Sequence, residues 1–167
     1  ILPAQWSPEP PADSSGVFLD LHSYGQLVLW PWGAVSDVAP NGPALEAMGR
    51  RMAFLNGATP KQAIEFYPTD GTTDDFAYGV LGVAAFTVET GYRFFEPCSV
   101  YESRLVDDML DLLRWSAKVA RAPYLLPAGP EVLELALSPR AIGAGGTVAL
   151  SAVADDARLV VTGGGVF

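Results

Sequence analysis

Two apolar runs predict strands that end in polar side chains. Residues 16–22 are apolar at positions 17, 18, 19 and 21, and His22 closes the run. Residues 82–91 form a second run, in which Glu89 lies near the carboxyl end. Near-continuous apolar runs are typical of strands covered on both faces. Because ligands in open α/β sheets bind beyond the carboxyl ends of strands, His22 and Glu89 mark a candidate site.

A further strand and a helix are predicted between these two runs. Residues 26–32 are mostly apolar, and Pro31 ends this strand or confines it to a sheet edge. Asn41 is expected to cap the following helix, which Asn56-Gly57 closes. The helix has one apolar face, made of Leu45, Met48, Met52 and Leu55. These side chains are expected to lie in the core.

The middle of the chain predicts a long loop and two more helices. Residues 59–73 are rich in turn formers and are expected to form a functional loop. A short helix with acidic residues at its start is predicted over 74–78. The clearest helix is predicted over 103–121, with acids early and bases late, as suits the helix dipole. Its wide apolar face comprises Leu105, Val106, Met109, Leu110, Leu112 and Leu113.

The character of the sequence changes after Pro123. Residues 125–131 read as a proline-rich linker, and short strands are predicted over 132–137, 147–153 and 159–162. Three short strands are too few for a stable sandwich. Either they pack on the first domain, or the sequence stops inside a second one, which is the interpretation we favour.

Composition narrows the classes of partner. Half of the 167 residues are apolar and 17% are charged, which predicts one folded domain with room for an appendage. A net charge of −9 argues against nucleic acid as a partner, because phosphate binding needs clustered Lys and Arg. The longest apolar run, over 80–88, is too short to span a bilayer, so no membrane partner is expected.

The start of the chain and its cysteine bear on the compartment. Ile1 leads into a proline-rich stretch without the charged region of a signal peptide, so a mature protein or a fragment is expected. Two lysines among many Gly, Pro and Ala residues suit a secreted bacterial enzyme. The single Cys98 is expected to be a buried thiol, or else half of a bridge to sequence outside this chain.

Without further context, His22 and Glu89 differ in how strongly each indicates a functional site. His22 is the only histidine, and a lone histidine at a strand end is more often structural than a ligand. No H-E-x-x-H motif, P-loop or dinucleotide-binding glycine motif is present in the sequence. Glu89 is harder to explain structurally, because a carboxylate in an apolar strand costs desolvation energy unless it is paired or functional. Partial burial would raise its pKa toward that of a useful base.

Three motifs carry a resemblance to a known family. HSYGQLVLWPWG starts at His22, DGTTDDFAYG follows Phe66-Tyr67, and FTVE ends at Glu89. In their order and spacing these segments resemble the zinc carboxypeptidases of the pancreatic A and B type, with secreted bacterial members the most similar. The resemblance covers 16–89, and the helix ending near 121 fits the end of that domain. It implies a three-layer α/β sandwich with a mixed, mostly parallel sheet, followed here by a short β-rich segment.

The resemblance also implies roles for single residues. His22 would be a ligand of Zn²⁺, and Glu89 would be the general base that takes a proton from the attacking water. Tyr67 would close over the substrate and hold its C-terminal residue. Ser23 and Tyr24, joined by a cis peptide bond, would line the neighbouring subsite.

Two acidic residues follow in the same segment. Asp74 matches the base of the specificity pocket, and an acid there resembles members that accept C-terminal Lys or Arg. Its other interpretation is an ordinary acid at a helix N-terminus. Asp75 is expected to be structural.

The sequence also departs from the family pattern. The family's other zinc ligands lie in an H-x-x-E motif upstream, and this chain has no second histidine. Residues 1–124 therefore look like the C-terminal half of the catalytic domain, 125–131 like a linker, and 132–167 like the start of a β-sandwich-like domain. The implied activity is removal of C-terminal residues from peptides and proteins, with this chain inactive alone. The rival hypotheses are a degenerate relative that binds peptides or a partner without catalysis, and a purely structural α/β domain.

Overall fold

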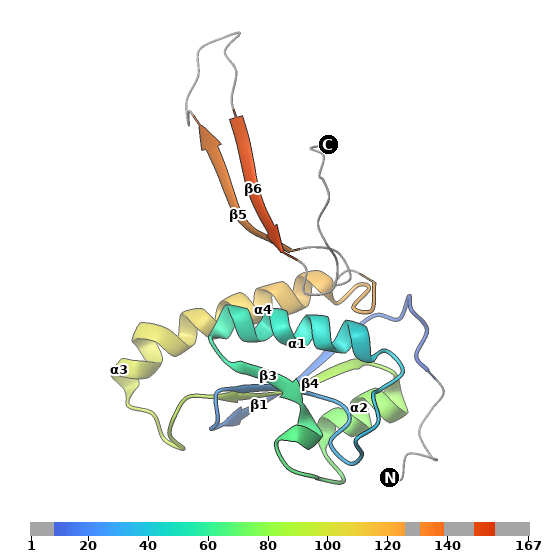
Figure 1. Cartoon of the computed structure of the whole chain (residues 1–167). Coiled ribbons are helices and arrows are strands. Elements are labelled where there is room, and N and C mark those ends of the chain that lie inside the picture. Colours follow the sequence, from blue (N-terminus) through green and yellow to red (C-terminus); the bar gives the residue numbers. More distant parts are fainter. Residues whose placement is uncertain (1–8, 126–130, 139–148, 156–167) are drawn as a thin grey trace. The chain divides into compact units, whose positions relative to one another are not determined.

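The computed structural model describes residues 9–125, 131–138 and 149–155. The chain divides into two compact units, Ile1–Ala128 and Gly129–Phe167, and each is described by itself. The first unit contains a four-stranded sheet with helices, and the second contains a two-stranded sheet (Figure 1).

The sheet of the first unit is mixed and mostly parallel, as predicted. It consists of β1 (Val17–Ser23), β2 (Leu27–Trp30), β3 (Thr59–Gln62) and β4 (Ala84–Thr90), in the order β1-β4-β2-β3. The pairs β1–β4 and β2–β3 are parallel, and β2 runs antiparallel to β4. Helices α1 (Gly42–Asn56) and α4 (Val106–Val119) cover one face, and α2 (Thr73–Leu81) covers the other (Figure 1). The unit is thus a three-layer α/β structure.

The core lies between the central strands and α1. All four residues of β2 are buried, and Phe86 and Val88 of β4 are fully buried. The predicted apolar face of α1 is confirmed at Leu45, Met48 and Met52, which are also fully buried. Gly49 on the same helix lies against Trp30, and a Cβ there would overlap the indole ring. The backbone of α1 can therefore approach the sheet closely.

The start of α1 shows a difference in detail. Asn41 occupies the predicted N-cap position, but its side chain makes no capping hydrogen bond. Its Oδ1 instead accepts from the hydroxyl of Tyr78, 2.9 Å away, and that hydroxyl accepts from the Asn41 N–H at 2.9 Å. This reciprocal pair ties α1 to α2. Burial raises the pKa of Tyr78 to about 12, so the phenol stays a donor at neutral pH. Gly57 closes the helix in the left-handed conformation, as predicted.

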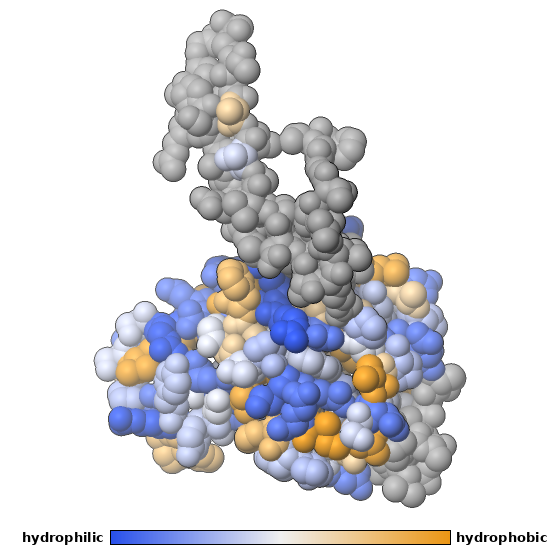
Figure 2. Space-filling view, in the orientation of Figure 1, coloured by the Kyte–Doolittle hydropathy of each residue, from blue (hydrophilic) through white to orange (hydrophobic). Residues whose placement is uncertain are grey.

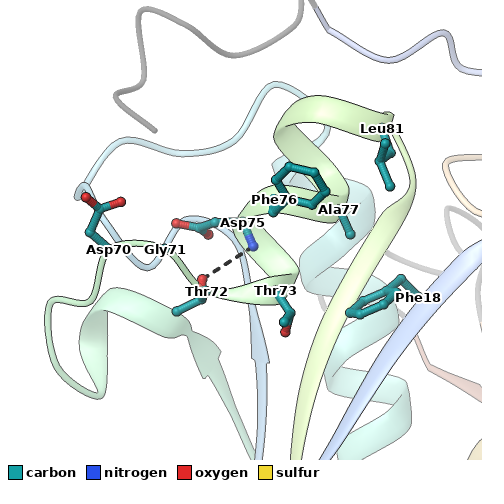
Figure 3. A pocket seen from close by; sticks show the side chains of 9 residues that line it. All are labelled: Phe18, Asp70, Gly71, Thr72, Thr73, Asp75, Phe76, Ala77 and Leu81. Carbon is teal, nitrogen blue, oxygen red and sulfur yellow. Dashed lines mark hydrogen bonds between the residues drawn. The ribbon is translucent and has the colours of Figure 1, made fainter.

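The prediction that the first strand is covered on both faces is wrong. Among the described residues β1 pairs only with β4 and forms an edge of the sheet. Its first four residues are half-buried and its last three are exposed, with Leu21 51% exposed. A mainly apolar hollow of about 470 Å³ lies beside it, and its lining includes Phe18 of β1 and Phe76, Ala77 and Leu81 of α2 (Figure 3). Apolar patches are also visible on the surface of this unit (Figure 2).

The predicted long loop contains regular structure. Strand β3 and a 3₁₀ turn, Ala63–Glu65, occupy residues 59–65. Pro60 lies opposite Val28 on the edge strand, where the lack of an N–H can be tolerated. Residues 66–72 follow without helix or strand.

The long C-terminal helix of the first unit starts earlier than predicted. A short helix α3 (Cys98–Val100) leads through the π-helical turn Tyr101–Leu105 into α4. The apolar face is narrower than predicted, because Leu110 and Leu113 are each 38% exposed. The prediction of a buried thiol is wrong, since Cys98 is exposed at the first turn. An exposed thiol remains compatible with the other interpretation, a bridge to sequence outside this chain.

The second unit contains β5 (Glu131–Ser138) and β6 (Ala149–Asp155), which pair antiparallel with an irregularity between Val132 and Glu134. Both strands were predicted. The third predicted strand, over 159–162, lies outside the described residues. Within the described part of the chain, no helix is long and apolar enough to cross a membrane.

Candidate active site

The register of the sheet brings the two predicted strand-end residues together. In the parallel pair β1–β4, His22 and Glu89 are direct Cα partners. The two strands run in the same direction, so both side chains lie at the carboxyl end of the pair. Two residues far apart in the sequence therefore share one place in the fold.

A cavity of about 250 Å³ opens at this end of the sheet and is lined by four of the six predicted site residues. Its lining includes His22, Tyr67, Asp74 and Glu89. Gly33, from the segment that follows β2, and Thr73, the first residue of α2, contribute to the wall. The cavity thus receives residues from both strands of the pair, from the segment after β3 and from α2.

Ser23 and Tyr24 lie outside this cavity. Ser23 lines a separate hollow with Arg93, Phe94 and Phe95, and its hydroxyl donates to the Phe94 carbonyl at 3.3 Å. Tyr24 is 53% exposed. The peptide bond that joins them is cis, as the family resemblance implied.

Glu89 has the environment of a carboxylate that is ready to take a proton. It is half-buried, and its Oε2 is buried without a hydrogen-bond partner among the described residues. Desolvation raises the pKa of Glu89, which the charge of nearby His22 opposes and that of Asp20 reinforces. A carboxylate with an unused oxygen and a raised pKa can act as a general base.

His22 is held by a residue that the sequence analysis did not single out. Its Nε2 lies 3.0 Å from Oδ1 of Asp20. The other oxygen of Asp20 accepts a hydrogen bond from the hydroxyl of Thr73. That hydrogen bond, and to a lesser extent the contact with His22, lowers the pKa of Asp20. The sequence could have indicated this contact through the spacing of Asp20 and His22, because residues two apart on a strand point to the same face.

The two neighbouring acids on α2 have different environments. Asp74 is 1% exposed and lines the cavity, and neither of its oxygens has a hydrogen-bond partner among the described residues. Asp75 accepts from the N–H of Gly33 at 2.9 Å and from that of Ala34 at 3.1 Å. Burial raises the pKa of Asp75 to about 6. Asp75 therefore anchors α2 to the segment after β2, whereas Asp74 lines the cavity with no hydrogen-bond partner among the described residues.

Tyr67 lies at the mouth of the cavity. It is 57% exposed, and its ring packs on that of Phe66 with centroids 4.6 Å apart. Thr69 Oγ1 donates to its carbonyl at 3.4 Å. The hydroxyl-bearing ring is thus accessible to a ligand that enters from solvent.

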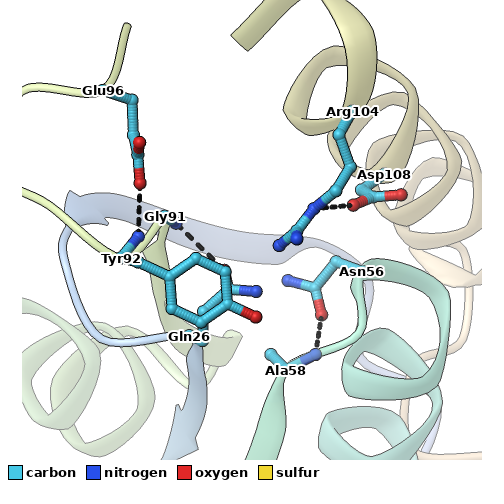
Figure 4. Close-up of polar contacts among 8 residues, drawn as sticks. All are labelled: Gln26, Asn56, Ala58, Gly91, Tyr92, Glu96, Arg104 and Asp108. Atoms are coloured by element: carbon cyan, nitrogen blue, oxygen red, sulfur yellow. Dashed lines mark hydrogen bonds and ion pairs between the residues drawn. The ribbon is translucent and has the colours of Figure 1, made fainter. Parts of the chain in front are cut away.

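A group of polar residues fixes the turn after β4 (Figure 4). Gln26 accepts from the N–H of Gly91 at 3.0 Å, and Glu96 accepts from that of Tyr92 at 2.6 Å. Arg104 stacks over the Tyr92 ring at 5.1 Å. These contacts hold the chain directly after Glu89, and sequence reasoning gave no sign of them.

The residues present fit part of a metal site. His22 offers an imidazole whose Nε2 is already bonded to Asp20, which leaves the other ring nitrogen for a metal. Among the described residues, however, no three His, Cys, Asp or Glu side chains lie together as a metal site. A catalytic zinc takes three protein ligands and a water. The described residues can therefore supply one metal donor but not the whole set of three.

These features define an α/β protein with an imidazole and a carboxylate at adjacent strand ends. The family model described as zinc carboxypeptidase matches residues 4–106, which is more than half of the chain. The chain belongs to the zinc carboxypeptidase family.

Individual relatives agree with this assignment. A zinc carboxypeptidase of Saccharothrix mutabilis subsp. capreolus is 42% identical over 77 residues, which cover 42% of this chain and 18% of the relative. Carboxypeptidase A4 of Mus musculus is 35% identical over 88 residues, which cover 47% of this chain and 21% of the relative. Carboxypeptidase A1 of Rattus norvegicus is 30% identical over 118 residues, which cover 64% of this chain and 28% of the relative. The chain thus spans only 18 to 28% of the length of these relatives.

Proposed function

We propose that this chain is part of a zinc-dependent carboxypeptidase that hydrolyses the C-terminal peptide bond of peptides and proteins. The observation that carries the proposal is the register of β1 and β4, which brings His22 and Glu89 together at one cavity. The zinc carboxypeptidase family and the relatives' names support the same reaction class.

His22 is the zinc donor of this half of the site. When bound, zinc lowers the pKa of a water and polarises the carbonyl to be cleaved. Glu89 takes a proton from the attacking water at Oε2, which has no hydrogen-bond partner among the described residues. Its raised pKa makes it a stronger base than an ordinary glutamate. The protonated Glu89 can then pass that proton to the leaving amine.

Three further predicted residues and Asp74 handle the substrate. Asp74 accepts the side chain of a C-terminal Lys or Arg, because its buried oxygens have no partner in the described protein. A buried charge without a partner is costly, and a substrate cation would remove that cost. Tyr67 holds the C-terminal residue from the cavity mouth, and Ser23 and Tyr24 line the neighbouring subsite.

The chain supplies only part of the enzyme. We assign residues 1–124 to the C-terminal half of the catalytic domain, 125–131 to a linker and 132–167 to the start of a β-sandwich-like domain. The exposed edge strand β1 and the single zinc donor support this division. The remaining zinc ligands come from an upstream half, without which the chain is inactive. Secretion by a bacterium agrees with the composition.

The test uses the longer protein, meaning this chain preceded by its upstream half. We expect one zinc per molecule and release of C-terminal Lys and Arg faster than Phe from otherwise identical peptides. Zinc content would be measured on the same preparation whose intact mass confirms the upstream half. A longer protein that binds peptides but neither holds zinc nor hydrolyses them would overturn the proposal and establish the binding-only relative.

A further inference from the structure

We propose that Asp20 is a positioning residue, which holds His22 with the proton on Nε2 and keeps Nδ1 open as the metal-binding atom. The role of Nδ1 rests on the proposed zinc site. The hydrogen-bonded state of the ring does not, because it exists in the chain without metal.

The position of the proton follows from the contact between the two side chains. Nε2 of His22 lies 3.0 Å from Oδ1 of Asp20. An ionised carboxylate only accepts hydrogen bonds, so Nε2 must carry the hydrogen. A neutral imidazole has one proton, and its second nitrogen then presents a lone pair. Nδ1 is therefore the only ring atom of His22 that can bind a cation.

Asp20 is itself held by a second hydrogen bond, which fixes the orientation of its carboxylate. Asp20 and His22 lie two residues apart on β1 and share one face of the strand. The second oxygen of Asp20 accepts from the hydroxyl of Thr73, at the start of α2. Both oxygens are thus engaged, and the carboxylate cannot rotate away from the ring without losing a hydrogen bond.

This chain of contacts links two parts of the site. Thr73 immediately precedes Asp74, and Asp75 anchors the same turn to Gly33. Thr73, Asp20 and His22 therefore connect the first turn of α2 to the imidazole on β1. The side chains of His22 and Asp20 are 48% and 27% exposed, so a single hydrogen bond between them would compete with water. The second tie, from Thr73, restricts that competition.

The single histidine makes the test direct. The 167-residue chain, labelled with [¹⁵N]histidine, gives one pair of ring signals, which magic-angle-spinning NMR reads even if the chain self-associates. The spectra are recorded in mildly alkaline buffer, where a neutral ring form can be observed. We expect one form, protonated at Nε2 and hydrogen-bonded there, with Nδ1 bare.

Two substitutions of Asp20 test whether it sets the protonated form of the ring. Asp20→Ala should give a mixture of ring forms and a weaker Nε2 hydrogen bond. Asp20→Asn should raise the share of the ring form protonated at Nδ1, because the Thr73 hydroxyl can keep the amide oxygen and leave the NH₂ group to donate to Nε2. Asp13→Ala is the control, since Asp13 is exposed and does not line the cavity. Proton on Nδ1 in the wild type, or wild-type signals in Asp20→Ala, would overturn the proposal.

A second readout follows the metal in the longer protein. Loss of a residue that orients a ligating histidine typically weakens metal binding about 10- to 100-fold. We expect that loss in zinc affinity for Asp20→Ala and for Asp20→Asn, and affinity close to wild type for Asp13→Ala. Unchanged zinc affinity in Asp20→Ala would overturn the positioning role. Absence of zinc from the wild-type longer protein would count against the proposed function instead, and the ring signals would still test Asp20.

Discussion

His22 and Glu89 are direct partners across the parallel pair β1–β4, although they lie 67 positions apart in the sequence. Parallel register fixes their relative height, because a slip of one residue would turn one side chain to the opposite face of the sheet. Val88, next to Glu89, is fully buried in the core, so the register is strongly specified. The packing of the core therefore sets the geometry of the site.

Substitution of Glu89 tests its role as a base. In the longer protein we expect Glu89→Gln to lower kcat by at least about 10²-fold, the usual contribution of a general base, with little change in KM. Zinc content should be unchanged, because Glu89 is not assigned as a ligand. Steady-state kinetics and metal analysis on one preparation measure both quantities.

The matched control is Glu102→Gln, which alters an exposed glutamate on the π-helical turn. It should leave kcat within about twofold of the wild type, as is usual for surface changes away from a site. A Glu89→Gln enzyme that retains wild-type kcat would refute the assignment of the base.

Asp74 can be tested against its structural interpretation. In the longer protein, Asp74→Asn should reduce kcat/KM for peptides ending in Lys or Arg about 30-fold or more, corresponding to about 2 kcal/mol for a lost buried charge pair. Peptides ending in Phe should be cleaved at least as well as by the wild type. Competition between the two kinds of peptide in one reaction gives the ratio directly.

Stability provides the control for the same substitution. If Asp74 only stabilised the helix N-terminus, Asp74→Asn would lower the free energy of unfolding by about 0.3–1 kcal/mol. We expect no loss, because the substitution removes a buried charge that has no partner in the described protein. Asp107→Asn, in the exposed first turn of α4, gives the reference value for a simple helix-dipole effect.

Much of the first unit could be predicted from local pattern. The apolar runs predicted β1 and β4. A one-sided apolar face, followed by Asn56-Gly57 as a helix end, predicted α1. Strand β3 was missed because its sequence, Thr59 to Gln62, is short and polar and contains a proline. Its pairing with β2 is a tertiary effect that overrides local propensity.

The site was predictable only to the level of single residues. Strand ends and motifs pointed to His22 and Glu89. Nothing local showed that Asp20 contacts His22, or that Asp74 is buried with no hydrogen-bond partner among the described residues. Such contacts depend on how α2 packs on β1. The error at Cys98 has a similar origin, since cysteine is usually buried and its exposure here follows from its place at an outer helical turn.

The pH dependence of stability should carry the signature of Asp75. Its pKa is raised from 3.8 to about 6 by burial, so the folded state binds a proton more tightly than the unfolded chain. Stability contributed by the protonated form is present below about pH 4 and falls as the pH rises through about 6, by at most about 3 kcal/mol because solvent screening reduces the effect. Urea unfolding of the wild type and of Asp75→Asn, between pH 4 and pH 8, measures the difference.

The variant retains an oxygen that can accept from Gly33 but cannot ionise, so its stability should lack this fall. The difference in free energy of unfolding between variant and wild type should therefore shift in favour of the variant across the same pH window. Parallel pH profiles for the two proteins would show that Asp75 titrates normally.

The exposed edge of the sheet predicts how the isolated chain behaves. Among the described residues β1 has an unpaired side, and its Leu21 is 51% exposed. Unpaired strand edges and exposed apolar surface are templates for association. We expect the 167-residue chain to self-associate with rising concentration, and sedimentation velocity measures its size distribution.

A charged side chain on the edge should oppose this association. Leu21→Lys places a cation on β1, which is how natural sheets protect exposed edges, and it should shift the distribution toward monomer. Val38→Lys is the control, because Val38 is 70% exposed but lies outside every described strand, so it should leave association unchanged. Equal effects of the two substitutions would assign association to general apolar exposure. A wild-type chain that stays a stable, monodisperse monomer at all concentrations would contradict the prediction, and with it the view that β1 is covered in the longer protein.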